Sequence, residues 1–154
     1  MDFLVAIEQL GAVRLLKGSY YAYPIVNALH IASIGVLLTS VWLMDLRVLG
    51  WLRSLPETVF LRLLRRVALA AFLCAVVTGL LLFSVRASEY ATLPVFLAKM
   101  ALIVLAALNL VLFIVLGRNR PEGQAPDRGE RAAALASALL WTGVLFAGRF
   151  IGFA

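Results

Sequence analysis

Four long apolar stretches, separated by polar segments, dominate the pattern of the chain. They cover about residues 24–46, 67–85, 93–116 and 132–150. Each is close to the roughly 20 residues that a helix needs to cross a hydrocarbon layer about 30 Å thick. Within lipid, only a helix satisfies all the backbone polar groups of a single segment. The pattern therefore predicts one all-α integral membrane domain over residues 1–154, a four-transmembrane-helix bundle in up-down-up-down order.

The N-terminal segment over residues 3–17 has a different pattern. Its apolar side chains lie roughly along one helical face, while Glu8, Arg14 and Lys17 lie elsewhere. This arrangement is typical of an amphipathic helix that lies in the membrane interface. A cluster of tyrosines at 20, 21 and 23 follows, and tyrosine is enriched at the depth of the lipid headgroups.

Composition supports a membrane protein. Hydrophobic residues make up 64% of the chain and charged residues 14%, whereas soluble domains are nearer half apolar and a quarter charged. The expected partner is therefore the lipid bilayer. The formal net charge of +6 does not predict nucleic-acid binding, because the arginines stand in blocks beside apolar spans and form no basic stripe with exposed aromatics.

The basic residues predict the orientation of the chain. Cytoplasmic connections of membrane proteins carry an excess of Lys and Arg. The first and third connections hold nine of them, whereas the N-terminal segment, the second connection and the C-terminal end together hold four. The nine are Arg47, Arg53, Arg62, Arg65, Arg66, Arg118, Arg120, Arg128 and Arg131. We therefore expect a bacterial inner-membrane protein with residues 117–130 as a cytoplasmic loop and both termini in the periplasm.

His30 is the only histidine, and it lies within the first apolar stretch. An ionisable side chain at membrane depth is costly and predicts a functional site. The topology brings Lys99 and Arg149 to the same outer half as His30. Asn27 and Ser33 lie one turn on either side of His30 on the same face. We predict these five residues as a cofactor-binding site, with His30 as the metal ligand.

An imidazole with nearby cations and little acid fits an anionic cofactor. Haem b suits it, with His30 on the iron and Lys99 and Arg149 on the propionates. Copper and a quinone are alternatives, the quinone hydrogen-bonded to His30 and Asn27. The chain has one cysteine, so covalent haem attachment through two cysteines is excluded. Two structural alternatives stay open: His30 as a hydrogen-bond donor between helices, and Lys99 and Arg149 reaching to the interface.

Asp45 marks the other end of the first stretch. It lies about 22 Å from His30 by helix rise. We expect Arg62, Arg65 or Arg66 as its partner in a structural ion pair. The alternative is a point of proton entry or exit.

Residues 24–50 carry a resemblance to a known family. The segment reads P-x5-H, then a spanning run, then D-L-R-x-L-G. This pattern resembles an uncharacterised bacterial family of four-helix membrane proteins, and the resemblance covers most of the chain.

A second, looser resemblance is to the copper-resistance D family and to the haem-binding HemJ-type membrane proteins. Those proteins also place a histidine early in a spanning helix and a lysine at the start of a later one, as in Pro94-Val-Phe-Leu-Ala-Lys99 here. The resemblance implies b-type haem or copper handling, with His30 and Lys99 as the matching positions.

Three functions follow from these residues. The first is a membrane protein that holds b-type haem for electron transfer to or from quinone or a periplasmic partner. The second is a transporter for copper, protons or a small anion. The third is a structural or assembly subunit of a larger membrane complex or homo-oligomer, since alanine runs in the second and fourth stretches favour helix contacts. The sequence leaves open whether the protein is an enzyme.

Overall fold

The computed structural model describes residues 2–52, 57–117 and 124–153, and its long elements are all helices. Four of the described helices are long and apolar enough to cross a membrane, namely α3, α4, α6 and α7. In chain order the elements are α1 (Asp2–Glu8), α2 (Gly11–Gly18), α3 (Ala22–Leu49), α4 (Glu57–Val85), α5 (Ala87–Tyr90), α6 (Pro94–Gly117), α7 (Arg128–Phe150) and a short 3-10 turn η1 (Ile151–Phe153). The prediction of an all-α membrane protein is confirmed at this level.

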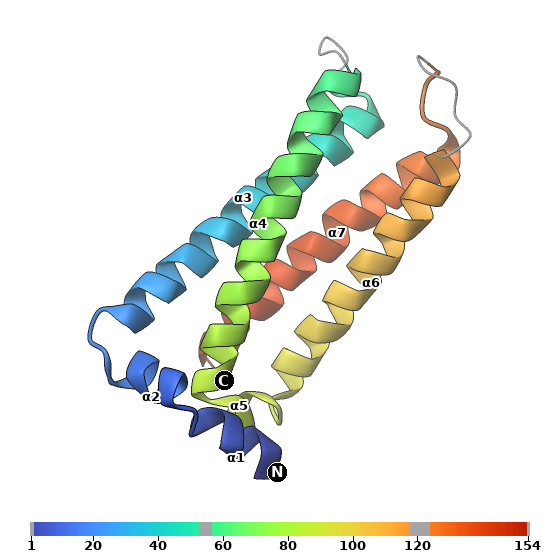
Figure 1. The fold of residues 1–154 in the computed structure, drawn as a ribbon. Coiled ribbons are helices and arrows are strands. Elements are labelled where there is room, and N and C mark those ends of the chain that lie inside the picture. Colours follow the sequence, from blue (N-terminus) through green and yellow to red (C-terminus); the bar gives the residue numbers. More distant parts are fainter. Residues whose placement is uncertain (1, 53–56, 118–123, 154) are drawn as a thin grey trace.

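The four long helices form two closely packed pairs (Figure 1). α3 packs along α4, α6 packs along α7, and α3 also contacts α7, which joins the pairs. The last turns of α3 and α6 lie at the same end of the molecule as the first turns of α4 and α7. α5 and both ends of the described chain lie at the opposite end. Residues far apart in the sequence therefore meet at each end.

Helix α4 begins at Glu57, ten residues before the apolar stretch that was predicted to cross the membrane. Its first turns carry Arg62, Arg65 and Arg66, whose side chains are exposed. Arginine and leucine are good helix formers, so the helix continues beyond its apolar part. Hydropathy marks the part of a helix that suits lipid, and the helix itself is longer.

The predicted single helix over residues 3–17 is divided in the structure. α1 ends at Glu8, and α2 starts at Gly11 after Leu10, which is extended with φ −57° and ψ 139°. The Arg14 Nε donates a hydrogen bond of 3.0 Å to Gln9 Oε1, across the break. Glycine is a poor helix former, and this favours a break beside residue 11.

The main apolar core lies where α3, α4 and α7 meet. Leu37 and Val41 of α3 pack against Ala68 and Ala71 of α4. Met44, Phe72 and Trp141 close around them, and the rings of Phe72 and Trp141 meet edge to face at 6.4 Å. Small residues on α4 let the two helices approach closely, as is common in membrane helix pairs.

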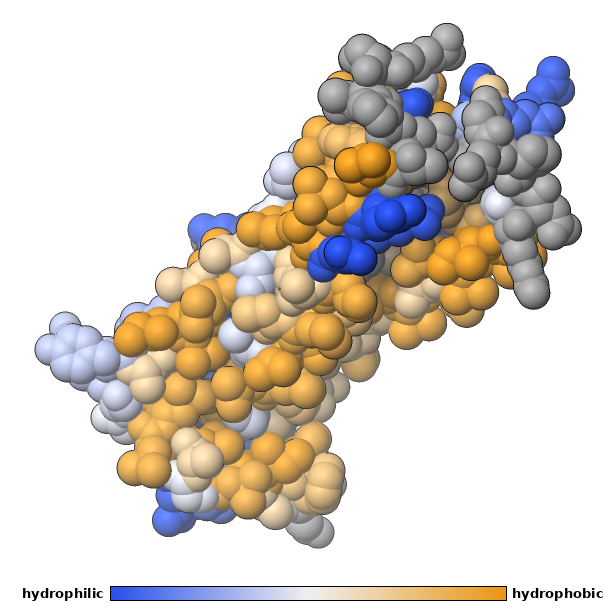
Figure 2. All heavy atoms as spheres, turned by 45° about the horizontal axis from the view of Figure 1, so that its top comes forward, coloured by the Kyte–Doolittle hydropathy of each residue, from blue (hydrophilic) through white to orange (hydrophobic). Residues whose placement is uncertain are grey.

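Small residues also bring α6 and α7 together. Ala106 is 2% exposed, and Ala133 and Ala134 of α7 are 4% and 1% exposed. The Asn109 amide donates a 2.9 Å hydrogen bond from Nδ2 to the Ala133 carbonyl. The rest of α6 carries mostly exposed apolar side chains, and Figure 2 shows such side chains over much of the visible face.

The start of α7 differs from the predicted solvated loop over residues 117–130. Asp127 caps the helix by accepting a 2.8 Å hydrogen bond from the Glu130 amide, and Glu130 Oε2 accepts one of 3.0 Å from the Asp127 amide. Glu130 is only 2% exposed. This reciprocal pair is a capping box, and the sequence Asp-Arg-Gly-Glu already contained its signature.

A hydrogen-bonded contact ties the N-terminal segment to the turn between α4 and α6. Glu8 Oε1 accepts hydrogen bonds from the Ser88 amide at 2.8 Å and from the Ser88 hydroxyl at 2.7 Å. These bonds stabilise the ionised carboxylate, so the pKa of Glu8 lies below its ordinary value of 4.5. The contact therefore fastens α1 to α5.

We expect this contact to fail in acid. A lowered pKa in the folded state stabilises the fold above the ordinary pKa, and the contribution is lost as the pH falls through the folded value. The protection factors of the α1 amides, which are corrected for the intrinsic pH dependence of exchange, should therefore fall in acid, below the ordinary carboxyl pKa of 4.5. Glu8→Gln should show the lower protection already at neutral pH and no further loss in acid. Equal α1 protection in both proteins at neutral pH would contradict the prediction.

Candidate functional site

His30 lies in the first half of α3 and points its ring at α4. Its Nδ1 is 2.9 Å from the Thr78 hydroxyl oxygen, and the ring is half-buried. Thr78 itself is buried, at 6% exposed. The only histidine of the chain is thus held against a neighbouring helix by a hydrogen bond.

The bonds around Thr78 favour one tautomer of the His30 ring. The Thr78 hydroxyl lies 2.7 Å from the Cys74 carbonyl, to which it donates. In that arrangement the hydroxyl accepts from His30, and the ring carries its proton on Nδ1 with a lone pair on Nε2. Metal-binding histidines commonly show this pattern, in which one nitrogen donates to a protein group and the other binds the metal.

Gly79 has no side chain and so leaves space for the His30 ring against α4. A Cβ at residue 79 would lie 3.0 Å from His30 Cε1, 3.6 Å from Nδ1 and 3.8 Å from Nε2. The first distance is too short for an ordinary contact, so a larger residue would displace the ring. The pair Thr78-Gly79 thus supplies both the hydrogen bond and the space for the ring.

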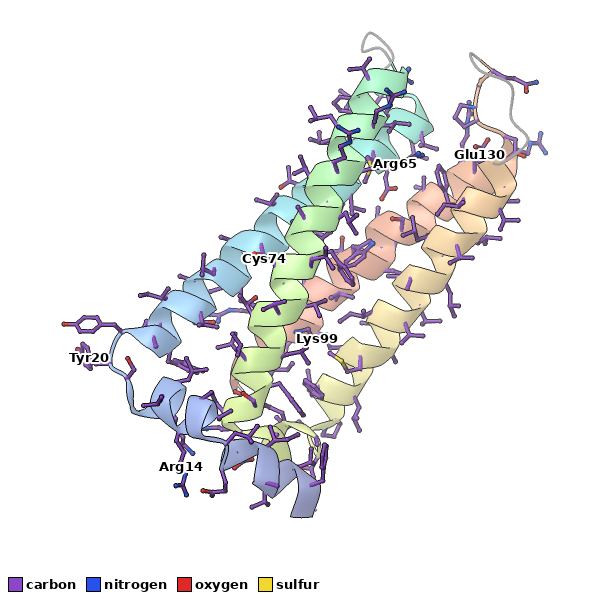
Figure 3. All side chains as sticks on the ribbon, in the orientation of Figure 1. Arg14, Tyr20, Arg65, Cys74, Lys99 and Glu130 are labelled. Carbon is purple, nitrogen blue, oxygen red and sulfur yellow. The ribbon has the colours of Figure 1, made fainter. Side chains whose placement is uncertain are left out.

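Lys99 joins the same region from the second helix pair. Its Nζ and Cε lie 3.6 Å from where a Cβ of Gly148 would be, so the lysine stem passes over a glycine of α7. Its ammonium lies within electrostatic range of the His30 ring. Figure 3 labels Lys99 between the two helix pairs, toward the end that holds the termini. We call His30, Thr78, Gly79, Lys99 and Gly148 the His30 site; it draws on α3, α4, α6 and α7.

The other three predicted site residues lie differently. Asn27 is exposed, although it is one turn from His30. Ser33 is buried, and its hydroxyl donates to the Leu29 carbonyl of its own helix at 2.7 Å. Arg149 is exposed in the last turn of α7, next to Gly148 in the chain. The structure therefore brings His30 and Lys99 together and leaves Asn27 and Arg149 at the surface.

Thr78, Gly79 and Gly148 were not among the predicted site residues. The polar and small pair Thr78-Gly79 in the middle of an apolar stretch was a usable signal. Its partner could not be read from the sequence, because nothing in a periodic pattern shows which helices are neighbours.

The described residues suit some cofactors better than others. They contain no group of three or more His, Cys, Asp and Glu side chains able to hold a metal ion. A copper ion held by protein side chains alone takes several ligands, and the His30 site offers one imidazole. Haem needs a single axial imidazole from the chain, because the porphyrin supplies the other ligands. A free Nε2 with a lysine nearby fits that requirement.

Asp45 does not form the predicted ion pair. Its Oδ2 is buried, and within the described part of the chain it has no hydrogen-bond partner and no arginine of α4 at ion-pair distance. Ser137 of α7 lies beside the carboxyl. The expectation failed because Arg62, Arg65 and Arg66 sit on exposed faces of α4, while Asp45 faces the packed side of α3.

A comparison with protein families gives one match. Residues 5–154 match a model described as a family of unknown function, DUF6644. No curated protein and no solved structure matches the chain. The match agrees with the resemblance to an uncharacterised family, and the resemblance to the copper-resistance D and HemJ-type proteins stays a prediction.

Proposed function

We propose that this chain, which belongs to the DUF6644 family, is a membrane protein that binds b-type haem through His30. The hydrogen bond from Nδ1 to Thr78 carries the proposal, because it leaves the Nε2 lone pair available to a metal. Haem, when bound, supplies one-electron transfer. The role of the chain is to orient the imidazole, to exclude water and to hold the propionates.

Lys99 is the residue that we assign to a propionate. A buried ammonium is costly unless a negative group accompanies it. Among the described residues no carboxylate bonds to Lys99, and haem carries two. Arg149 lies near the same end and is assigned to the second propionate, while Asn27 and Ser33 border His30 on α3.

We further propose that the long helices cross the bacterial inner membrane in alternating directions, with both termini in the periplasm. The arginine-rich ends of α4 and α7 lie together at one end of the molecule, and the bias of basic residues assigns that end to the cytoplasm. α1 and α2 would then lie in the outer interface. The His30 site would face a periplasmic electron-transfer partner or the quinone pool.

The visible absorption spectrum tests the haem proposal. The full chain, purified in detergent from haem-replete cells, should show a Soret band. His30→Ala should lose it completely, because no other described imidazole can replace the ligand. Thr78→Val should keep haem but bind it about 10- to 100-fold more weakly, as seen when the partner of a ligating histidine is removed.

Cys74→Ala serves as the matched control. Cys74 lies one turn from Thr78 on α4, its side chain is exposed, and only its backbone carbonyl takes part in the site. The Soret band should be unchanged in this variant. A wild-type protein without any haem band, or a band that survives in His30→Ala, would contradict the proposal.

One observation favours a second function, in which the chain is a subunit of a homo-oligomer or of a larger membrane complex. Among the described residues of α6 only Ala106 is fully buried, and most of the other side chains of this 24-residue helix are apolar and exposed. Such a face suits lipid and equally suits another membrane helix. Cross-linking through single cysteines placed on the exposed face of α6 would show a homo-oligomer, and a monomer at all concentrations would reject this function.

A further inference from the structure

A second polar site lies at the arginine-rich end, well away from the His30 site. Asp45 is 9% exposed on α3, and its Oδ2 has no hydrogen-bond partner among the described residues. It lies 15 residues after His30, or about 22 Å by helix rise. The cofactor proposal makes no use of it.

None of the described groups around Asp45 neutralises its carboxylate. From α7, Ser137 lies beside the carboxyl, and Arg131 is exposed. From α4, the three arginines at 62, 65 and 66 are exposed and form no ion pair with it; Figure 3 labels Arg65 near this end. On α3 itself, Arg47 has interactions of its own, and residues two apart on a helix do not face each other.

We propose that Asp45 is a proton-binding site of the protein, reached from the arginine-rich end. An ionised carboxylate without a partner is far more costly to bury than a neutral carboxyl, which needs only ordinary hydrogen bonds. The Ser137 hydroxyl is placed to supply one such bond. The carboxyl therefore takes a proton where it is packed and can return it to water at the nearby helix ends.

A proton fits this site better than a metal cation. Small cations need six or more oxygen ligands, usually including several carboxylates. The described residues place one carboxyl and one hydroxyl here, and they contain no cluster of acidic ligands. A proton needs only one carboxyl oxygen.

Infrared difference spectroscopy tests the proposal on the full chain in lipid vesicles at neutral pH. The wild-type spectrum minus that of Asp45→Asn should contain the carbonyl band of a protonated carboxyl, and the band should shift in D2O. Glu8→Gln is the control, because Glu8 is hydrogen-bonded at the molecular surface as a carboxylate; it should leave the band in place. Ser137→Ala should shift the band without removing it.

Other results would overturn the proposal. Carboxylate bands in place of the carbonyl band would show that Asp45 is ionised. Carboxylate bands that also differ between sodium and potassium buffers would assign the site to a cation. If Asp45→Asn does not fold, the shift in Ser137→Ala decides, and a wild-type spectrum without any protonated carboxyl rejects the proposal. These outcomes are independent of haem binding.

Discussion

Gly79→Val should displace the His30 ring from α4 and destabilise the protein. The added Cβ would lie 3.0 Å from His30 Cε1, and the two methyl groups would need further space. Either the helices separate or the ring rotates away and loses its 2.9 Å hydrogen bond to Thr78. Overpacking of this kind costs about 1–3 kcal/mol. Thermal unfolding in detergent micelles should show the loss of stability, and the Soret band should disappear with it.

Gly35→Val is the matched control for this substitution. Gly35 also lies inside a long helix, α3, and a Cβ there would meet nothing within 4 Å. The change in helix propensity is the same at the two positions, so the difference between the variants isolates the contact with His30. Equal stability of the two variants would show that the His30 ring does not pack on Gly79.

Ala106→Leu should separate α6 from α7. Ala106 is 2% exposed and is the only buried residue of α6 among those described. It lies one turn before Asn109, whose amide bonds to the Ala133 carbonyl at 2.9 Å. A larger side chain has no free space there, so we expect a loss of about 1–3 kcal/mol in the free energy of unfolding.

Ala107→Leu provides the comparison. Ala107 is the next residue along α6 and is exposed, so its added atoms should meet lipid or detergent. We expect its unfolding free energy to stay within about 0.5 kcal/mol of the wild type, as for other surface substitutions. Similar losses in both variants would contradict the packing of α6 on α7 through Ala106.

The sequence predicted the helices well because lipid imposes a simple rule on them. A span must be long and apolar, so residues 93–116 predicted α6 at Pro94–Gly117 within one residue at each end. The prediction was poorer where that rule does not apply. Residues before Val67 are rich in arginine, and hydropathy could not show that α4 already begins at Glu57.

The site was predicted in part, for a similar reason. His30 and Lys99 stood out because ionisable side chains are rare inside apolar stretches, and the structure brings them within electrostatic range. Gly148 did not stand out, because glycine is common in membrane helices. Asp45 was expected to pair with arginines of α4, and it faces Ser137 of α7 instead.

By itself, the sequence determined that the chain is a helical membrane protein and which ionisable groups its long helices carry. Both are properties of single segments: their length, their hydropathy and the cost of charge in lipid. The tertiary structure decided that His30 Nδ1 meets Thr78, that a glycine of α4 faces the ring, and that none of the described side chains forms an ion pair with Asp45. These depend on which faces of different helices meet, and packing of side chains across α3, α4, α6 and α7 sets that.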